Sequence, residues 1–167
     1  MTRLGLIAGG GGLPLALAEH CRASGRPYFV IRLRGFAEAA MASHPGDVAG
    51  IAEIGRIIKL ARDAGCRSLC FAGVVRRPDF ASLKPDLRGV AWLPGAVGAA
   101  RRGDEALLRY LMGEFEKEGF AIEGADRAGL AGIVGVAGRT LVVGRAAVAA
   151  AADAAGIFVA GVTDRPA

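Results

Sequence analysis

Glycines gather at the end of the first apolar segment, in a pattern that suits the binding of a phosphate group. Leu4–Ala8 predicts a strand covered on both faces, Gly9–Gly12 follows it, and Pro14 stands where a helix is expected to begin. Glycines let the backbone approach a phosphate, and free amides at a helix start bind one. The G-x-G-x-x-G fingerprint is not met, because Pro14 stands where the third glycine would fall, and no Walker A pattern follows. Gly9–Leu13 is therefore a candidate phosphate- or nucleotide-binding loop, and a tight glycine turn without a ligand is the alternative.

A second loop is expected at the same edge of the sheet. Gly73–Pro78 follows the strand predicted over Ser68–Ala72. Ligands of open α/β sheets lie outside the carboxyl ends of the strands, so this loop should line the same crevice as Gly9–Leu13. Arg76 or Arg77 would meet a diphosphate there. Two solvated arginines on a surface turn are an equally good interpretation.

A third cluster of charged residues, at 101–105, precedes a strong helical pattern. Asp104 is most simply the N-cap of that helix. Alternatively, Asp104 and Glu105 hold a divalent cation beside a phosphate, and Arg102 binds the phosphate itself.

The other chemically capable residues favour structural roles. His20 and His44 are too few for a histidine-rich metal site, and His20 lies in the first predicted helix. The three cysteines, Cys21, Cys66 and Cys70, predict buried free thiols in a reducing compartment. No Ser-His-Asp set or zinc site is recognisable, so local residues alone name no reaction.

The elements that must position these groups alternate between strand and helix. Strands are predicted over Leu4–Ala8, Tyr28–Leu33, Ser68–Ala72 and Phe120–Glu123, and helices from Pro14 to Ala23, over Ile54–Ala64 and over Glu105–Glu118. Residues 35–50 are expected to be irregular, and residues 78–95, with three prolines, to form an ordered connection. This alternation favours an α/β fold with a doubly wound, mainly parallel sheet.

Composition changes at Gly124, which suggests a boundary between residues 1–125 and a tail over 126–167. The tail predicts a short helix over Ala128–Ala131, a strand over Thr140–Val143, a helix over Arg145–Ala155 and a strand over Ile157–Val162. We expect residues 124–127 to join the fourth strand to the tail, so that one continuous sheet forms.

Composition excludes several classes of protein. The chain has 167 residues, of which 53% are hydrophobic, enough for a core without disulfides. No polar low-complexity tract predicts disorder, and the longest apolar run, Ala146–Ala152, is far too short to span a membrane. The net charge of +5 is scattered, which argues against a nucleic-acid surface. Arginine richness fits either codon bias or a mild preference for anionic ligands. The start of the chain predicts a first strand rather than a signal peptide, hence a cytoplasmic protein.

Three segments in order resemble a known family. They are LGLIAGGGGLP at residues 4–14, CFAGVVRRPDF at 70–80 and RRGDEALLRYLMGEFEKEGFAIEGA at 101–125. Together they are similar to the bacterial UDP-2,3-diacylglucosamine pyrophosphatase of lipid A synthesis. The resemblance implies a Rossmann-like N-terminal domain and Mg²⁺-dependent hydrolysis of the substrate diphosphate to UMP and lipid X. The residues that the resemblance places at the substrate are Gly11, Gly12, Leu13, Gly73, Val74, Val75, Gly103 and Asp104. Arg102 and Glu123 complete the set of candidate substrate-binding residues.

The resemblance also shows where this chain departs from the family. After Asp126 the sequence is similar to the family's extreme C-terminal segment, and the stretch between, which carries the catalytic acid, is missing. Val136, Gly144 and Ala146 stand where the family has acidic residues. Catalytic residues and metal ligands therefore stay unassigned, because neutral side chains replace neither a general base nor a Mg²⁺ ligand.

Three functions remain open on this basis. The first is hydrolysis of UDP-2,3-diacylglucosamine, with groups not yet identified or supplied across the interface of a homo-oligomer. The second is UDP or nucleotide binding without turnover, and the third is a scaffold without a ligand. The expected partner is the UDP-linked acylated sugar or lipid X, with room for peripheral contact with the inner-membrane surface, and no nucleic acid is expected.

Overall fold

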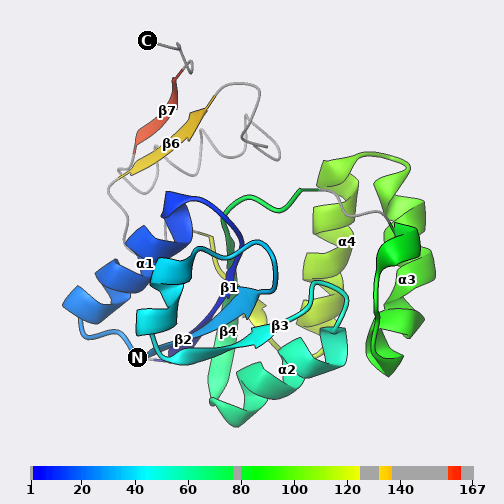
Figure 1. Cartoon of the computed structure of the whole chain (residues 1–167), viewed down its shortest axis with the longest axis horizontal. Helices are drawn as coiled ribbons and strands as arrows, with labels where there is room; N and C mark the ends of the chain where they lie inside the picture. The colour runs from blue at the N-terminus through cyan, green and yellow to red at the C-terminus, as the bar shows by residue number, and fades with distance from the viewer. Residues whose placement is uncertain (1, 77–79, 125–131, 137–157, 163–167) are drawn as a thin grey trace.

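The computed structural model describes residues 2–76, 80–124, 132–136 and 158–162 (Figure 1). Its elements, in chain order, are β1 (Arg3–Ala8), α1 (Gly12–Ala23), β2 (Tyr28–Leu33), η1 (Ala39–Ser43), β3 (Gly46–Ala49), α2 (Ile54–Asp63), β4 (Cys66–Ala72), η2 (Phe80–Ser82), α3 (Leu87–Ala100), α4 (Asp104–Lys117), β5 (Ala121–Ile122), β6 (Gly132–Val136) and β7 (Phe158–Val162).

The first five strands form one parallel sheet in the order β3-β2-β1-β4-β5. Leu6 of β1 lies between Val30 of β2 and Cys70 of β4. The chain winds outward from β1 to β3 and then crosses to β4, so the order reverses between β1 and β4. This confirms the predicted doubly wound parallel sheet. Ligands of such sheets bind at the carboxyl ends of the strands beside the reversal.

Helices cover both faces of this sheet, as Figure 1 shows, with α1 on one face and α2, α3 and α4 on the other. On the α1 side, Leu4, Leu6 and Ala8 of β1 pack with Leu17 of α1. On the other side, Ile7 joins a cluster that includes residues of α2, Trp92 of α3 and Phe115 of α4. Because β1 is buried on both faces, its nearly continuous apolar sequence is explained.

Two elements lie in segments for which no strand or helix was predicted. Within residues 35–50, β3 pairs with β2 at the edge of the sheet. The first residue of β3 is Gly46, and a Cβ at this position would lie 2.0 Å from the carbonyl oxygen of Val30. The close approach of the two strands therefore requires glycine, although glycine is disfavoured in strands. Within residues 78–95, α3 begins at Leu87 and contains Pro94, which is exposed. The Asp86 side chain caps this helix by accepting from the Gly89 amide.

The stripe predicted for α4 is less buried than expected. Phe115 is buried against Trp92 in an edge-to-face arrangement, with ring centroids 5.1 Å apart. The other four stripe residues are half-buried: Leu107, Leu108, Leu111 and Met112. The reason is that α4 packs against α3 as well as against the sheet. Because α3 contributes small residues such as Ala96 and Ala99, it covers the larger side chains of α4 only in part.

The described strands of the tail form a second sheet. β6 and β7 pair with each other in parallel, from Gly132↔Phe158 to Val136↔Val162. The expected single continuous sheet is therefore wrong for these strands, because each satisfies its backbone groups with the other, whereas β5 offers two paired residues. The strand predicted over Ile157–Val162 is observed as β7, and β6 was not predicted. The elements predicted at 128–131, 140–143 and 145–155 lie outside the described residues.

The cysteines behave as predicted. Cys21, Cys66 and Cys70 are buried, and none of them forms a disulfide. Burial raises the pKa of the Cys21 and Cys66 thiols. Within the described part of the chain, no helix combines the length and the apolar character needed to cross a bilayer.

Candidate functional site

The two glycine loops lie side by side at the carboxyl edge of the sheet. Gly10 donates its amide to the carbonyl of Val74 at 2.9 Å, and Val74 donates to the carbonyl of Gly10 at 2.8 Å. Gly9 donates to the carbonyl of Ala72 at 2.8 Å. We call Gly9–Leu13 and Gly73–Val75 the glycine-loop pair. The sequence prediction that both loops line one edge is thus supported by direct backbone hydrogen bonds.

Glycine is required at two positions of the glycine-loop pair. Gly11 has a φ of 84° and Gly73 a φ of 93°, a region that other residues rarely adopt. A Cβ on Gly73 would also lie 2.6 Å from the carbonyl oxygen of Gly10. At Gly11 and Gly12, by contrast, an added Cβ would meet nothing within 4 Å. The backbone of these two residues is therefore open to a ligand.

The start of α1 offers backbone donors at this edge. Gly12 and Leu13 are its first two residues, so their amides have no acceptor within the helix. Gly11, the N-cap, has no side chain to cap them, and Pro14 lacks an N–H. Such donors, with the positive end of the helix dipole, suit an anion. Gly11, Gly12 and Leu13 therefore stand together as a candidate phosphate-binding segment.

Glu38 is the residue of this region that sequence reasoning missed. It follows β2, and its Oε1 accepts from the amide of Gly11 at 3.1 Å. A Cβ on Gly10 would lie 3.9 Å from the same oxygen. The signal was present in the sequence, because in Rossmann-type folds an acidic residue near the end of the second strand contacts the ribose of a bound nucleotide.

The turn between α3 and α4 holds the third predicted cluster. Gly103, with a φ of 123°, is the N-cap of α4, and no side chain caps the helix there. The expectation that Asp104 is the N-cap is therefore wrong: the turn needs positive φ at the cap, and Asp104 becomes the first helical residue, exposed. Glu105 forms an ion pair with Arg109 at 2.7 Å. Arg102 is exposed, and its backbone amide bonds to Ala99 within the turn.

Glu123 lies in a different environment from the glycine-loop pair. Its Oε2 is 2.7 Å from Nη2 of Arg26, and the two side chains are 14% and 15% exposed. Arg26 precedes β2 and so lies at the amino edge of the parallel sheet, opposite the glycine loops. The structure thus gives Glu123 an ion-pairing partner, and its role in substrate binding stays a prediction.

The remaining candidates are placed as follows. Val74 and Val75 are exposed at 51% and 39%, and Arg76 is exposed beside them. Arg77 and positions 144 and 146 lie outside the described residues, and of Val136 only the strand placement is described. His20 is half-buried in α1 and is not among the residues of the glycine-loop pair.

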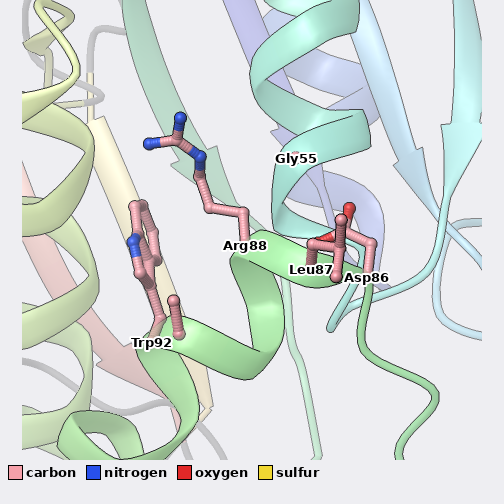
Figure 2. Close-up of a pocket in the computed structure, with 6 residues that line it drawn as sticks. Gly55, Asp86, Leu87, Arg88 and Trp92 are labelled. Carbon is pink, nitrogen blue, oxygen red and sulfur yellow. The ribbon is translucent and has the colours of Figure 1, made fainter.

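A shallow pocket of about 520 Å³ lies elsewhere, between the starts of α2 and α3 (Figure 2). Its charged groups already have partners. Asp86 accepts from the amides of Gly89 and Arg56 at 2.8 and 2.9 Å, and Arg88 pairs with Glu118. Burial alone would raise the pKa of Asp86, but hydrogen bonds from backbone amides, Gly89 first, lower it overall. These groups stabilise the helix starts, so the glycine-loop pair is the better candidate site.

Metal ligation can be tested on the described side chains. Among them, no three His, Cys, Asp or Glu side chains come together in a way that would hold a metal ion. Asp104 and Glu105, the pair considered for a cation, include one carboxylate that already pairs with Arg109. The described residues therefore do not form a metal centre by themselves.

Strand order and the two glycine loops define a Rossmann-like α/β domain. The family model described as the LpxI N-terminal domain matches residues 3–128, so the chain belongs to this family. Over 125 residues it is 57% identical to the UDP-2,3-diacylglucosamine pyrophosphatase LpxI of Caulobacter vibrioides, a match that covers 75% of this chain. The match covers 45% of that relative, so the chain spans less than half of its length. Among solved structures, the Bordetella bronchiseptica enzyme WbmH in complex with NAD⁺ has a TM-score of 0.41 and 10% identity, covering 98% of this chain and 56% of that one. This last likeness is too low to bear on function.

Proposed function

We propose that this chain binds the UDP diphosphate of UDP-2,3-diacylglucosamine at the glycine-loop pair and takes part in its hydrolysis to UMP and lipid X. The observation that carries the proposal is the 57% identity to a UDP-2,3-diacylglucosamine pyrophosphatase over the segment that contains both loops. The geometry supports it, because the amides of Gly12 and Leu13 and the open backbone of Gly11 suit a diphosphate.

The resemblance adds Mg²⁺ to this proposal. Mg²⁺ in phosphate sites is held by one or two carboxylates together with the phosphates of the substrate. Because the described side chains form no cluster of three ligands, we assign no step of the reaction to the ion. We extend the proposal to a cytoplasmic location, which three buried cysteines without a disulfide favour.

Binding is tested by calorimetric titration of the full chain with UDP, with and without Mg²⁺. The informative variant is Gly12→Glu, since a side chain there meets nothing within 4 Å and adds negative charge beside the α1 amides. Gly98→Glu is the matched control, because Gly98 is an exposed glycine of α3 that also has open space around it. We expect Gly12→Glu to weaken UDP binding at least tenfold while Gly98→Glu binds as the wild type. Equal UDP affinity in Gly12→Glu would contradict the placement.

Hydrolysis is tested by following UMP release from UDP-2,3-diacylglucosamine. Release above a no-protein control supports the pyrophosphatase function in this chain. Saturable UDP binding without release supports the second candidate, nucleotide binding without turnover. Absence of both binding and release would contradict the proposal.

A further inference from the structure

Glu38 places a carboxylate where the loops after β1, β2 and β4 meet. The chain turns back after β2, with the amides of Phe36 and Ala37 both bonding to the carbonyl of Leu33 at 3.0 Å. This turn brings Glu38 Oε1 to 3.1 Å from the amide of Gly11. A Cβ on Gly10 would lie 3.0 Å from the carbonyl of Phe36 and 3.5 Å from that of Val74, so Gly10 is held between the two neighbouring loops.

The charge of Glu38 is not neutralised by a side chain of the described residues. Arg34, the cation nearest in sequence, pairs with Glu53 instead, at 3.3 Å. The bond from Gly11 uses one carboxylate oxygen, and an ionised carboxylate accepts about four hydrogen bonds in all. Glu38 is exposed, so its carboxylate is accessible to a ligand bound beside Gly11.

An exposed carboxylate beside amides that suit a diphosphate restricts the ligand. A carboxylate accepts hydrogen bonds, attracts cations and repels phosphate oxygens. Because UDP carries no cationic group, the part of this ligand that meets Glu38 must be an uncharged hydrogen-bond donor. A vicinal diol fits this requirement, because its two hydroxyls donate to the two oxygens of one carboxylate. The ribose of a nucleotide carries such a diol next to its phosphates.

We propose that Glu38 selects ribonucleotides at the glycine-loop pair by accepting hydrogen bonds from the ribose diol. The inference rests on the proposed function for the position of the diphosphate and deepens it by naming the specificity-determining residue. Glu38 makes the site prefer a ribonucleoside diphosphate over its 2′-deoxy analogue and over inorganic pyrophosphate. The Gly11 contact orients the carboxylate for this role.

The test compares UDP, 2′-deoxy-UDP and inorganic pyrophosphate by calorimetry on wild type, Glu38→Gln and Glu116→Gln. Glutamine keeps an oxygen that accepts from Gly11 but loses the charge and replaces the second acceptor with a donor. Glu116, exposed on α4, is the control for loss of one negative charge. Wild type and Glu116→Gln should bind UDP about tenfold to a hundredfold more tightly than 2′-deoxy-UDP, the range for one hydrogen bond to a charged group.

Glu38→Gln should reduce this preference to within about twofold of unity and leave pyrophosphate binding equal or tighter, because the repulsion is removed. A merely structural role for Glu38 would weaken pyrophosphate and both nucleotides together. The proposal is overturned if wild type shows no preference for the diol, if Glu38→Gln keeps it, or if all three ligands weaken in parallel.

ADP and 2′-deoxy-ADP separate this inference from the proposed function. UDP binding without a diol preference leaves the proposed function standing and removes the role of Glu38. If ADP shows a diol preference that depends on Glu38 but UDP does not bind, the role of Glu38 stands and the proposed function fails. If neither ribonucleotide binds, both fail.

Discussion

Gly73 joins the two glycine loops, and its replacement by alanine is the sharpest test of the site geometry. Gly73 has a φ of 93°, and a Cβ there would lie 2.6 Å from the carbonyl oxygen of Gly10, 2.7 Å from Cγ of Pro14 and 2.9 Å from the carbonyl carbon of Gly9. Two of these atoms belong to the backbone and the third to a buried proline. None of them can swing aside like the end of a flexible side chain, so the loops themselves must separate.

The cost of Gly73→Ala follows from two contributions. Positive φ in a residue with a Cβ costs about 1–2 kcal/mol. Separation of the loops breaks the two hydrogen bonds between Gly10 and Val74, at 2.9 and 2.8 Å, each worth about 1 kcal/mol net. We therefore expect the free energy of unfolding to fall by about 3–4 kcal/mol. For a domain of this size, that corresponds to a melting temperature lower by roughly 10 °C.

Urea denaturation followed by tryptophan fluorescence measures this loss. Trp92 is the single tryptophan of the chain and is 7% exposed, so its emission reports on unfolding of the core. Gly98→Ala is the control, since Gly98 lies within α3 with open space around it, and alanine there should stabilise by up to about 1 kcal/mol. A Gly73→Ala protein within about 0.5 kcal/mol of wild type, less than a single net hydrogen bond, would refute the reasoning.

Three further predictions concern the structure away from the glycine-loop pair. Glu123→Ala removes one partner of the Arg26–Glu123 ion pair and should lower the free energy of unfolding by about 2–4 kcal/mol, measured by urea denaturation. The double variant Glu123→Ala/Arg26→Met should recover part of this loss, because no unpaired charge is left. An unchanged stability of Glu123→Ala would argue that Glu123 acts on a ligand instead. Asp86→Ala, which removes the side chain that caps α3, should lose about 1–2 kcal/mol at pH 7. The pKa of Asp86 is lowered in the folded state, so the stabilisation by its ionised carboxylate is complete above about pH 4 and is lost as the pH falls further. The free energy of unfolding of the variant should therefore depend less on pH between about pH 5 and 2 than that of the wild type. Cys21 and Cys66, whose pKa values are raised by burial, should react with a thiol reagent at pH 7.5 only after urea unfolds the chain, and rapid labelling of the native protein would contradict their burial.

The elements that sequence predicted well are those whose local pattern agrees with their packing. β2 was predicted with its observed bounds, because its first four residues, 28–31, favour strands and β2 lies inside the sheet. α2 was predicted within one residue, since Ile54, Ile57, Ile58 and Ala61 form one buried face and Gly65 follows the helix with a φ of 71°.

The elements that sequence missed are explained by tertiary contacts. β3 begins with Gly46, which its close approach to Val30 demands and which reads locally as a turn after Pro45. α3 contains Pro94, whose missing hydrogen bond is tolerated on an exposed face while Trp92 anchors the helix in the core. Neither β2 beside Gly46 nor the aromatic contacts of Trp92 can be inferred from a local window.

The candidate site shows the same division. The glycine loops were predicted because their chemistry is local: glycines, a following helix start and a preceding strand. The contact between Gly11 and Glu38 spans 27 residues and depends on the turn after β2. Gly10 lies between the carbonyls of Phe36 and Val74, where a side chain would be crowded. Its lack of a side chain therefore lets the contact with Glu38 and the hydrogen bonds with Val74 form at the same time. One glycine therefore couples the loop proposed to bind the diphosphate to the residue proposed to read the ribose. It follows that a side chain at Gly10 should weaken binding of pyrophosphate and UDP together, whereas Glu38→Gln should weaken UDP binding and leave pyrophosphate binding equal or tighter.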